Sequence, residues 1–183
     1  PDDLAKYPRD VEGDRELALE AGATTVWAPT VAEIYPGEVQ KISAGLLGNL
    51  FEGVKRPGHF DGVLTVVARL FEKVKPTHAI CGEKDFQQLF LIKQMAKDVE
   101  IIGLPTVREK DGLAMSSRNV RLSPEDRQRA LVIYRALKSG KLKETLATEP
   151  KFKTDYAVII DEETFQIATP TTKHKRALIA GTV

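Results

Sequence analysis

The sequence of 183 residues contains a single cysteine, Cys81. One cysteine cannot form an internal disulfide, so the fold does not rest on a disulfide framework, and we expect a reducing, cytoplasmic setting. Cys81 stands at the end of a short apolar segment. We therefore expect a small buried side chain there rather than a nucleophile.

The chain also lacks an excess of one charge, a long apolar run and an internal repeat. Its 27 basic and 26 acidic residues are interleaved and leave a net charge of +1, without a basic stripe for nucleic acid. No apolar run is long enough to cross a bilayer, and the N-terminus lacks the basic-then-apolar order of a signal peptide. We therefore expect neither nucleic acid nor a membrane as a partner. Hydrophobic residues make up 42% of the chain, enough for the core of one domain, with or without a small appendage.

The middle of the chain alternates helices and strands. Apolar residues at helical spacing predict a helix over residues 58–74, with a face made of Val63, Val66, Val67, Leu70, Phe71 and Val74. We then predict a strand over residues 78–81, a helix from Asp85 to Lys97 and a strand over residues 100–104. This order predicts a parallel sheet, with the start of the second helix at the carboxyl edge of the strands.

The beginning of the chain has the same α/β character. Residues 14–21 have helical composition and end before Gly22, and residues 24–29 predict a short buried strand. Thr30 and Glu33 have the spacing of a capping box, which predicts a brief helical turn that ends at Pro36-Gly37.

The segment AICGEKDFQQ, residues 79–88, is the first candidate site, because a strand ends there in a charged turn that opens into a helix. Such a junction offers unpaired backbone N–H groups to an anion. Gly82 lets the backbone approach a ligand closely, and Lys84 adds a mobile positive charge. Asp85 and Gln88 have the spacing of a capping box. The pattern fits an anion site and a simply well-capped helix equally well.

Two further residues precede the helix over 58–74. Arg56 and His59 are expected at the same edge as Lys84, where a guanidinium and an imidazole would suit a carboxylate or a phosphate. A histidine that only hydrogen-bonds its own loop fits the same pattern.

A third candidate follows Pro105. Asp111-Gly112 predicts a turn, and Ser116, Ser117 and Arg118 are good ligands for phosphate oxygens, although a polar loop before a helix fits as well. Ser123-Pro124 predicts the start of a helix that ends near Gly140, with a face made of Ala130, Ile133, Tyr134 and Leu137.

The end of the chain changes character. Tyr156, Val158 and Ile160 alternate as in a strand, residues 161–163 predict a turn, and residues 165–168 and 176–180 predict further short antiparallel strands. Residues 141–153 read as a polar linker. We expect two domains, residues 1–106 and a small α+β domain of residues 107–183, with a hinge at residues 106–108.

Four motifs occur in order along the chain: YPRD, RPGHFDGVLTVV, CGEKDFQQL and PTVREKDGLAMSSRN. Together they resemble the pantothenate synthetase family, the ATP-dependent pantoate–β-alanine ligases, and the likeness continues more weakly through DYAVIIDEET and KRALIAG. The resemblance implies an α/β fold, namely a Rossmann-like nucleotidyltransferase parallel sheet with a smaller α+β C-terminal domain that acts as a lid, and a homodimer. It also implies that pantoate and ATP form pantoyl adenylate and pyrophosphate, after which β-alanine displaces AMP.

The resemblance also implies roles for individual residues. His59 and Lys84 are similar to the groups that meet the phosphates and the reacting carboxylate. Gly82 and Asp85 resemble the ribose contacts, and Val107 resembles an adenine contact. The segment Met115-Ser116-Ser117-Arg118 resembles a KMSKS-type loop that closes over the triphosphate. Mg²⁺ is expected with ATP, with no direct protein ligand assigned.

The substrate side of the site is implied in the same way. Gln88 is similar to the family glutamine that holds pantoate, and the apolar wall around the gem-dimethyl group of pantoate resembles Val63, Val66 and Val67. Arg56 and Tyr7, from the RPGH and YPRD motifs, are expected to contact the substrate.

The sequence departs from the family pattern at its start. The N-terminal strand with its HxGH-type motif and the glutamine before YPR are absent, and the chain begins at Pro1. Residues 97–99, the part between the two C-terminal segments and the ending after GTV look shorter than in the family, and Cys81 replaces an aromatic residue. We therefore expect a truncated chain, or one joined from its ordered parts.

Two other functions fit parts of this pattern. Another adenylyltransferase of the same fold would share the strand–turn–helix site without needing a valine wall beside Gln88. A noncatalytic binding or dimerisation fragment would follow if the N-terminal segment is truly absent.

Overall fold

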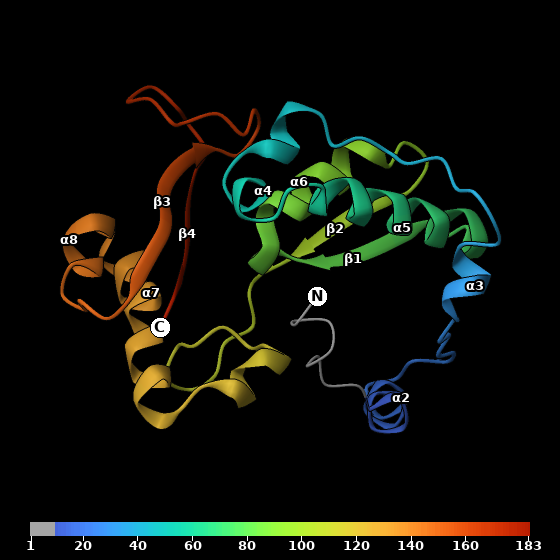
Figure 1. Ribbon diagram of the computed structural model, residues 1–183, viewed down its shortest axis with the longest axis horizontal. Helices are drawn as coiled ribbons and strands as arrows, with labels where there is room; N and C mark the ends of the chain where they lie inside the picture. Colours follow the sequence, from blue (N-terminus) through green and yellow to red (C-terminus); the bar gives the residue numbers. More distant parts are fainter. Residues whose placement is uncertain (1–9) are drawn as a thin grey trace.

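The computed structural model describes residues 10–183, so the predicted substrate contact Tyr7 lies outside the described residues. Figure 1 shows two bodies of secondary structure, one built on the β1–β2 sheet and one on the β3–β4 ribbon. The described elements, in chain order, are α2 (Val11–Glu20), α3 (Val31–Ile34), η1 (Leu46–Asn49), α4 (Glu52–Lys55), α5 (His59–Val74), β1 (His78–Gly82), η2 (Glu83–Asp85), α6 (Phe86–Met95), β2 (Glu100–Leu104), η3 (Ser117–Arg121), α7 (Pro124–Ser139), α8 (Leu142–Leu146), β3 (Lys153–Asp161) and β4 (Lys175–Thr182).

The predicted parallel pairing is confirmed. Strands β1 and β2 run side by side in register from His78 opposite Glu100 to Gly82 opposite Leu104. Helices α5 and α6 lie over one face of this sheet (Figure 1). The predicted order of helix, strand, helix and strand over residues 58–104 is therefore correct, with boundaries within two residues of those expected.

The core under α5 and α6 is made by both helices and the sheet. Phe60 and Leu64 of α5 are buried against Leu91 and Ile92 of α6, and Cys81 and Ile101 of the strands pack against them. Cys81 is half-buried, in line with its expected packing role. The predicted face is confirmed in part: Val63, Val67 and Phe71 pack against this cluster, whereas Val74 is exposed. The most buried residues of the face, Phe60 and Leu64, were not among those predicted.

The N-terminal part contains two short helices. Helix α2 begins earlier than predicted because the carboxylate of Asp10 accepts a hydrogen bond from the Gly13 N–H at 3.0 Å. The predicted capping box of Thr30 and Glu33 is confirmed at the start of α3. The predicted buried strand at residues 24–29 is wrong: the segment is irregular, and Trp27 is 44% exposed. No described strand pairs with it, so its backbone lacks the ladder that defines a strand.

The C-terminal part packs α7 and α8 against an antiparallel ribbon. Strands β3 and β4 pair from Lys153 opposite Thr182 to Asp161 opposite Lys175, which confirms the predicted antiparallel arrangement. Residues 141–153 are not a polar linker, since this stretch contains α8 and contributes to a core cluster of Val132, Ala136, Leu142, Leu146 and Phe152. That cluster shows how the apolar side chains of a charged segment become buried when a helix partner lies opposite them.

Two further expectations for this part need correction. The most buried face of α7 is Val132 and Ala136 rather than the predicted one, because the predicted member Tyr134 faces residues 107–114 and lies under the guanidinium of Arg108 at 5.1 Å. Residues 165–168 make a single bridge, Ile167 with Ile160, instead of a strand. Phe165 has φ of 60°, and its ring is buried, so the chain turns there. The start of α7 at the Ser123 cap and its end at Gly140 are confirmed.

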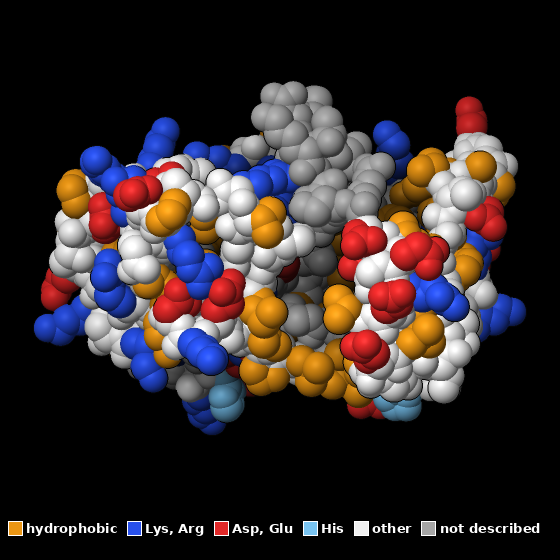
Figure 2. All heavy atoms as spheres, turned by 90° about the horizontal axis from the view of Figure 1, so that it is seen from below, with side chains coloured by type: hydrophobic (Ala, Val, Ile, Leu, Met, Phe, Trp, Pro, Cys, Tyr) orange, Lys and Arg blue, Asp and Glu red, His pale blue; other side chains and the backbone are white. Residues whose placement is uncertain are grey.

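The surface mixes both charges. On the face seen in Figure 2, Lys and Arg side chains are interspersed with Asp and Glu side chains, and hydrophobic side chains gather near the middle of the lower margin. No helix in the described part of the chain is long and apolar enough to cross a membrane.

Candidate active site

Residues 83–86, called the Lys84 turn, connect the carboxyl end of β1 to the start of α6. The strand ends at Gly82, one short turn (η2) holds Lys84, and α6 begins at Phe86. Lys84 Nζ lies 3.4 Å from Asp85 Oδ1, and both side chains are open to solvent. The predicted capping box is wrong, because the Asp85 side chain makes no cap hydrogen bond within the described residues. Its backbone (φ −98°, ψ 62°) continues from η2 instead of adopting the extended geometry of an N-cap, and its carboxylate faces Lys84.

Arg56 and His59 flank the start of α5. Gly58 has φ of 75°, a conformation that favours glycine, and this turn brings the two side chains together, with Arg56 Nη1 3.1 Å from His59 Nε2. Burial, and then the positive charge of Arg56, lower the pKa of His59, partly offset by Glu52 and Asp85. His59 is therefore neutral at neutral pH, and its ring nitrogen accepts from the guanidinium.

The two groups lie at one edge of the sheet. Helix α5 ends at Val74 and β1 begins at His78, so the short connection makes the helix run antiparallel to the strand. His59, the first residue of α5, therefore lies at the same end as Gly82, the last residue of β1. An exposed ammonium and a neutral imidazole at this edge would suit an anionic ligand.

The neighbouring glutamines of α6 differ in their contacts. Gln88, the predicted pantoate contact, is half-buried, and its side-chain amide makes no hydrogen bond to another described residue. Gln87 is buried, donates its amide to the carbonyl oxygens of Leu47 at 2.8 Å and Leu50 at 2.9 Å, and accepts from the Glu52 N–H at 3.3 Å. Sequence reasoning missed Gln87. Its position four residues before the buried Leu91 places it on the inner face of α6, and that spacing was the available signal.

The predicted valine wall is partly a core surface. Val63 and Val67 pack against the cluster around Phe60 and Leu64, and Val66 is half-buried on α5. These side chains are not fully open to a ligand in the described structure. Gly82 is exposed at the end of β1, and a side chain there would meet no other atom within 4 Å, so close backbone approach is possible.

The predicted phosphate loop lies in another part of the molecule. Val107 and Met115 are exposed, and the Met115 N–H donates to the Val107 carbonyl at 2.9 Å. Ser116 caps η3 through a hydrogen bond from the Arg118 N–H at 3.2 Å. Figure 1 shows this segment beside α7 and apart from α5 and α6. The structure thus groups Arg56, His59 and Lys84 at one edge, and it keeps the segment containing Ser116 and Ser117 separate.

An ionic network supports that loop, and sequence reasoning missed it. Arg127 of α7 donates to Glu109 Oε2 at 2.7 Å and to Asp111 Oδ2 at 2.6 Å. Asn119 donates to Glu109 Oε1 and to the Ala114 carbonyl, both at 3.0 Å. Hydrogen bonds from Arg127 and Asn119 lower the pKa of Glu109, and the Leu113 N–H lowers the pKa of Asp111 ahead of Arg127. The network ties both arms of the 107–119 segment to α7.

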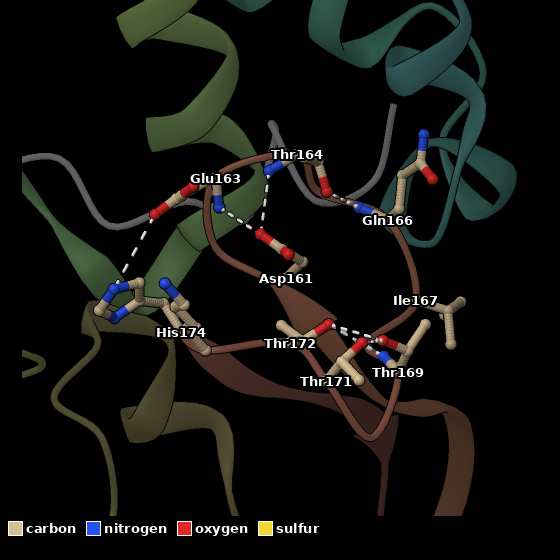
Figure 3. Close-up of a pocket in the computed structure, with 10 residues that line it drawn as sticks. Asp161, Glu163, Thr164, Gln166, Ile167, Thr169, Thr171, Thr172 and His174 are labelled. Carbon is tan, nitrogen blue, oxygen red and sulfur yellow. Dashed lines mark hydrogen bonds and ion pairs between the residues drawn. The ribbon is translucent and has the colours of Figure 1, made fainter.

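Two surface hollows lie elsewhere. One of about 370 Å³ is lined by residues 161–174, the connection from β3 to β4, where Figure 3 shows Thr169 hydrogen-bonded to Thr171 and Thr172 and His174 paired with Glu163. Another of about 610 Å³ borders α5 and includes Arg69. Neither hollow is lined by a predicted site residue. Within residues 10–183, no three His, Cys, Asp or Glu side chains lie close enough together to hold a metal ion.

Comparison with known proteins finds strong similarity over the whole chain. The family model for pantoate-beta-alanine ligase matches residues 1–183. The pantothenate synthetase of Thermus thermophilus is 45% identical over 201 residues, covering 98% of this chain and 73% of that protein. The pantothenate synthetase of Rubrobacter xylanophilus is 44% identical over 211 residues, covering 100% of this chain and 72% of that protein.

Solved structures agree with these relatives. The crystal structure of the Thermus thermophilus pantothenate synthetase superposes with a TM-score of 0.90 at 45% identity, covering 98% of this chain and 72% of that chain. The Francisella tularensis pantoate-beta-alanine ligase, solved with β-γ ATP and β-alanine, gives a TM-score of 0.81 at 32% identity, covering 100% of this chain and 69% of that chain. The mixed α/β fold with a parallel sheet is therefore the one found in these ligases.

Proposed function

The chain belongs to the pantoate-beta-alanine ligase family, and we propose that this ligase condenses pantoate with β-alanine in two steps that consume ATP. In the first step a carboxylate oxygen of pantoate attacks the α-phosphorus of ATP, and the bond to pyrophosphate breaks. In the second step the amine of β-alanine attacks the acyl carbon, loses a proton and displaces AMP. The support for ATP is the Francisella tularensis relative, whose structure contains an ATP analogue and β-alanine.

The observation that carries the proposal is the grouping of Lys84 and His59 at the carboxyl edge of the parallel strands. Lys84 extends into solvent beside Gly82, so its ammonium can meet phosphate oxygens as they gain charge. His59, held neutral by burial and by Arg56, would donate or accept a hydrogen bond at the reacting carboxylate without adding a full charge. Arg56 would offset the carboxylate charge of pantoate.

The remaining contacts follow from the position of each residue. The Gln88 amide faces no described hydrogen-bond partner and is available to the hydroxyl or carboxylate oxygens of pantoate. The gem-dimethyl group of pantoate would lie against the half-buried Val63, Val66 and Val67. Gly82 and Asp85 would bind the ribose, since one allows close approach and the other supplies an exposed carboxylate.

The segment of Val107, Met115, Ser116, Ser117 and Arg118 would act from the second half of the molecule. Val107 offers an exposed apolar surface to adenine, and the serine hydroxyls with Arg118 would close over the triphosphate. This requires residues 107–183 to rotate as a lid relative to residues 1–106, with the hinge at 106–108, about a junction at which Phe165 stays packed against Phe86 and Phe90. The separation of the two groups in Figure 1 is the reason for proposing such a closure.

Three features of the setting belong to the same proposal. Mg²⁺ would be held through the ATP phosphates, where it offsets charge and orients the leaving pyrophosphate. The enzyme would act as a homodimer. A cytoplasmic location would fit the single free cysteine, Cys81.

The test is pantoate-dependent exchange of labelled pyrophosphate into ATP by the full-length protein. Pantoate should drive exchange in the absence of β-alanine, and addition of β-alanine should release AMP. Exchange driven by a different acid and not by pantoate would identify another adenylyltransferase and reject this proposal. Absence of exchange with any acid would favour a noncatalytic role.

A further inference from the structure

Arg176 of β4 contacts the Lys84 turn from the other half of the molecule. Its Nη1 donates to Glu83 Oε2 at 3.0 Å, and its Nε donates to Glu162 Oε1 at 2.7 Å. The guanidinium carbon lies 4.2 Å from the centre of the Phe86 ring. One side chain therefore contacts an acidic group and an aromatic ring that belong to the same turn.

The two residues that Arg176 contacts in this turn lie on either side of Lys84 in the sequence. Glu83 precedes Lys84 directly, and Phe86 follows it by two residues. The Glu83 side chain also passes close to β2, because a side-chain carbon at Gly103 would lie only 3.5 Å from Glu83 Cγ. Glu83 is thus held between β2 on one side and β4 on the other, which limits the orientations that the turn can adopt.

The pairing is partly shielded from water. Arg176 and Glu83 side chains are each 26% exposed, so the charges interact more strongly than a fully exposed pair would. The planar guanidinium binds both carboxylates and stacks on an aromatic face at the same time, which an ammonium group cannot do. Loss of Arg176 would leave Glu83 and Glu162 without the cation between them.

Aromatic contacts reinforce the same junction. The ring of Phe165, in the segment after β3, stacks on Phe86 at 6.3 Å with an interplanar angle of 12° and lies 4.9 Å from the Phe90 ring. Phe86 is therefore fixed by an arginine of β4 and by a phenylalanine from the connection between β3 and β4. This packing connects the start of α6 to the C-terminal half.

We propose that Arg176 is a positioning residue that holds Glu83 and Phe86 and thereby directs Lys84 toward the reacting phosphate. The inference rests on the proposed function, and it adds a contribution of the C-terminal half that comes from β4 rather than from the Ser116 loop. Because the charge of Lys84 matters most as the phosphate oxygens gain charge, misplacing it should slow adenylation more than it weakens pantoate binding.

The experiment compares Arg176→Ala, Arg176→Lys and a matched control in the full-length protein. The control is Arg129→Ala, because Arg129 and Asp126 form a pair on α7 whose side-chain exposures, 26% and 33%, match those of Arg176 and Glu162. Single-turnover formation of pantoyl adenylate gives the rate, and equilibrium titration gives the pantoate Kd. Melting temperatures show that each variant is folded.

We expect Arg176→Ala to lower the adenylation rate about 10- to 100-fold with a change in pantoate Kd below about threefold. The adenylation rate of Arg176→Lys should lie between those of Arg176→Ala and wild type. Lysine keeps the positive charge but lacks the planar guanidinium that binds both carboxylates. Added ethylguanidinium should restore part of the rate in Arg176→Ala. Arg129→Ala should keep the rate within about twofold of wild type.

A second variant keeps the test decisive if Arg176→Ala does not fold. Glu83→Gln preserves the shape of the side chain, removes its charge and should also lower the rate at nearly constant pantoate Kd. A wild-type rate in a folded Arg176→Ala or Glu83→Gln would overturn the inference, as would a loss no larger than that of Arg129→Ala.

Failure of the proposed function is distinguishable from failure of this inference. If the wild-type protein shows no pantoate-dependent pyrophosphate exchange, the proposed function fails. Amide hydrogen exchange of residues 83–86 then still tests whether Arg176 restrains the turn. Faster amide hydrogen exchange of residues 83–86 in Arg176→Ala than in Arg129→Ala supports this restraint. Equal exchange rejects it.

Discussion

The side-chain amide of Gln87 donates a hydrogen bond to the carbonyl oxygen of Leu50 at 2.9 Å. The same nitrogen donates to Leu47, and the amide oxygen accepts from the Glu52 N–H. This buried side chain of α6 therefore satisfies three backbone groups of the loop that leads to Arg56. Phe51, within that loop, has φ of 47°, so the contact holds a backbone conformation that a phenylalanine seldom adopts.

Replacing Gln87 with leucine should destabilise the protein. Leucine has a similar size but cannot bond the three backbone groups, and buried unsatisfied groups of this kind cost about 1–3 kcal/mol. Urea unfolding followed by circular dichroism measures the change. Gln88→Leu is the control, since the Gln88 amide makes no hydrogen bond to another described residue, and its effect on unfolding should stay within about 0.5 kcal/mol. An equal effect of both variants would contradict the role of Gln87.

Replacing Lys84 with alanine should reduce adenylation far more than it weakens pantoate binding. The lysine charge gains most of its interaction in the transition state, so its removal should slow single-turnover adenylation by about 100-fold or more. Lys93→Ala, at an exposed position of α6, is the control and should leave the rate unchanged. A Lys84→Ala rate equal to that of wild type would refute the role assigned to Lys84.

The titration of His59 should follow the lowered pKa. Burial is the main cause and Arg56 adds to it, so NMR titration of the imidazole should give a midpoint below 6.5. In Arg56→Met the midpoint should rise toward 6.5, because one of the two causes is removed. A midpoint at or above the ordinary histidine value in the wild-type protein would contradict this assignment.

The same shift has a consequence for stability. The folded state binds fewer protons at His59 than the unfolded state, so unfolding free energy is highest above the unfolded pKa of 6.5 and falls as the pH drops through the folded pKa. His59→Asn should therefore reduce the loss of stability that wild type shows as the pH falls below 6.5. Urea unfolding at several pH values measures this, and an unchanged pH dependence would count against it.

Phe165→Ala should cost about 3–5 kcal/mol of unfolding free energy, because the ring is fully enclosed and its removal leaves a cavity between two halves of the molecule. The ring is 1% exposed and lies 5.9 Å from the Phe51 ring as well as beside Phe86 and Phe90. Ile167→Ala is the control: that side chain is exposed, and its loss should change stability by less than about 0.5 kcal/mol. Thermal and urea unfolding together measure both variants.

Local signals explain which elements were predictable. Helix α5 and strand β1 were predicted within one residue, because apolar residues at helical spacing mark the helix and Lys75-Pro76 separates it from the strand. The caps at Thr30 and Ser123 were correct for the same reason. Each of these features depends on residues three or four apart, whose interaction needs no knowledge of the rest of the chain.

The errors have a common physical origin in packing partners. Residues 24–29 have the apolar and β-branched composition of a strand, yet a strand needs a neighbour to satisfy its backbone, and no described strand lies beside them. Leu142 and Leu146 looked like isolated residues in a polar linker, yet they are buried because α7 offers Val132 and Ala136 opposite them. In both cases the outcome depended on whether another element packs against the segment.

The sequence by itself determined the family, the helix and strand order of residues 58–104, and the candidates Lys84, His59 and Gln88, because motifs and periodicity are carried by neighbouring residues. Only the tertiary structure decided which backbone groups the Gln87 amide bonds and that Arg176, 93 residues beyond Glu83, lies against the turn that follows β1. Contacts between distant residues depend on how whole elements pack, and that packing is the sum of many small interactions that no short pattern contains.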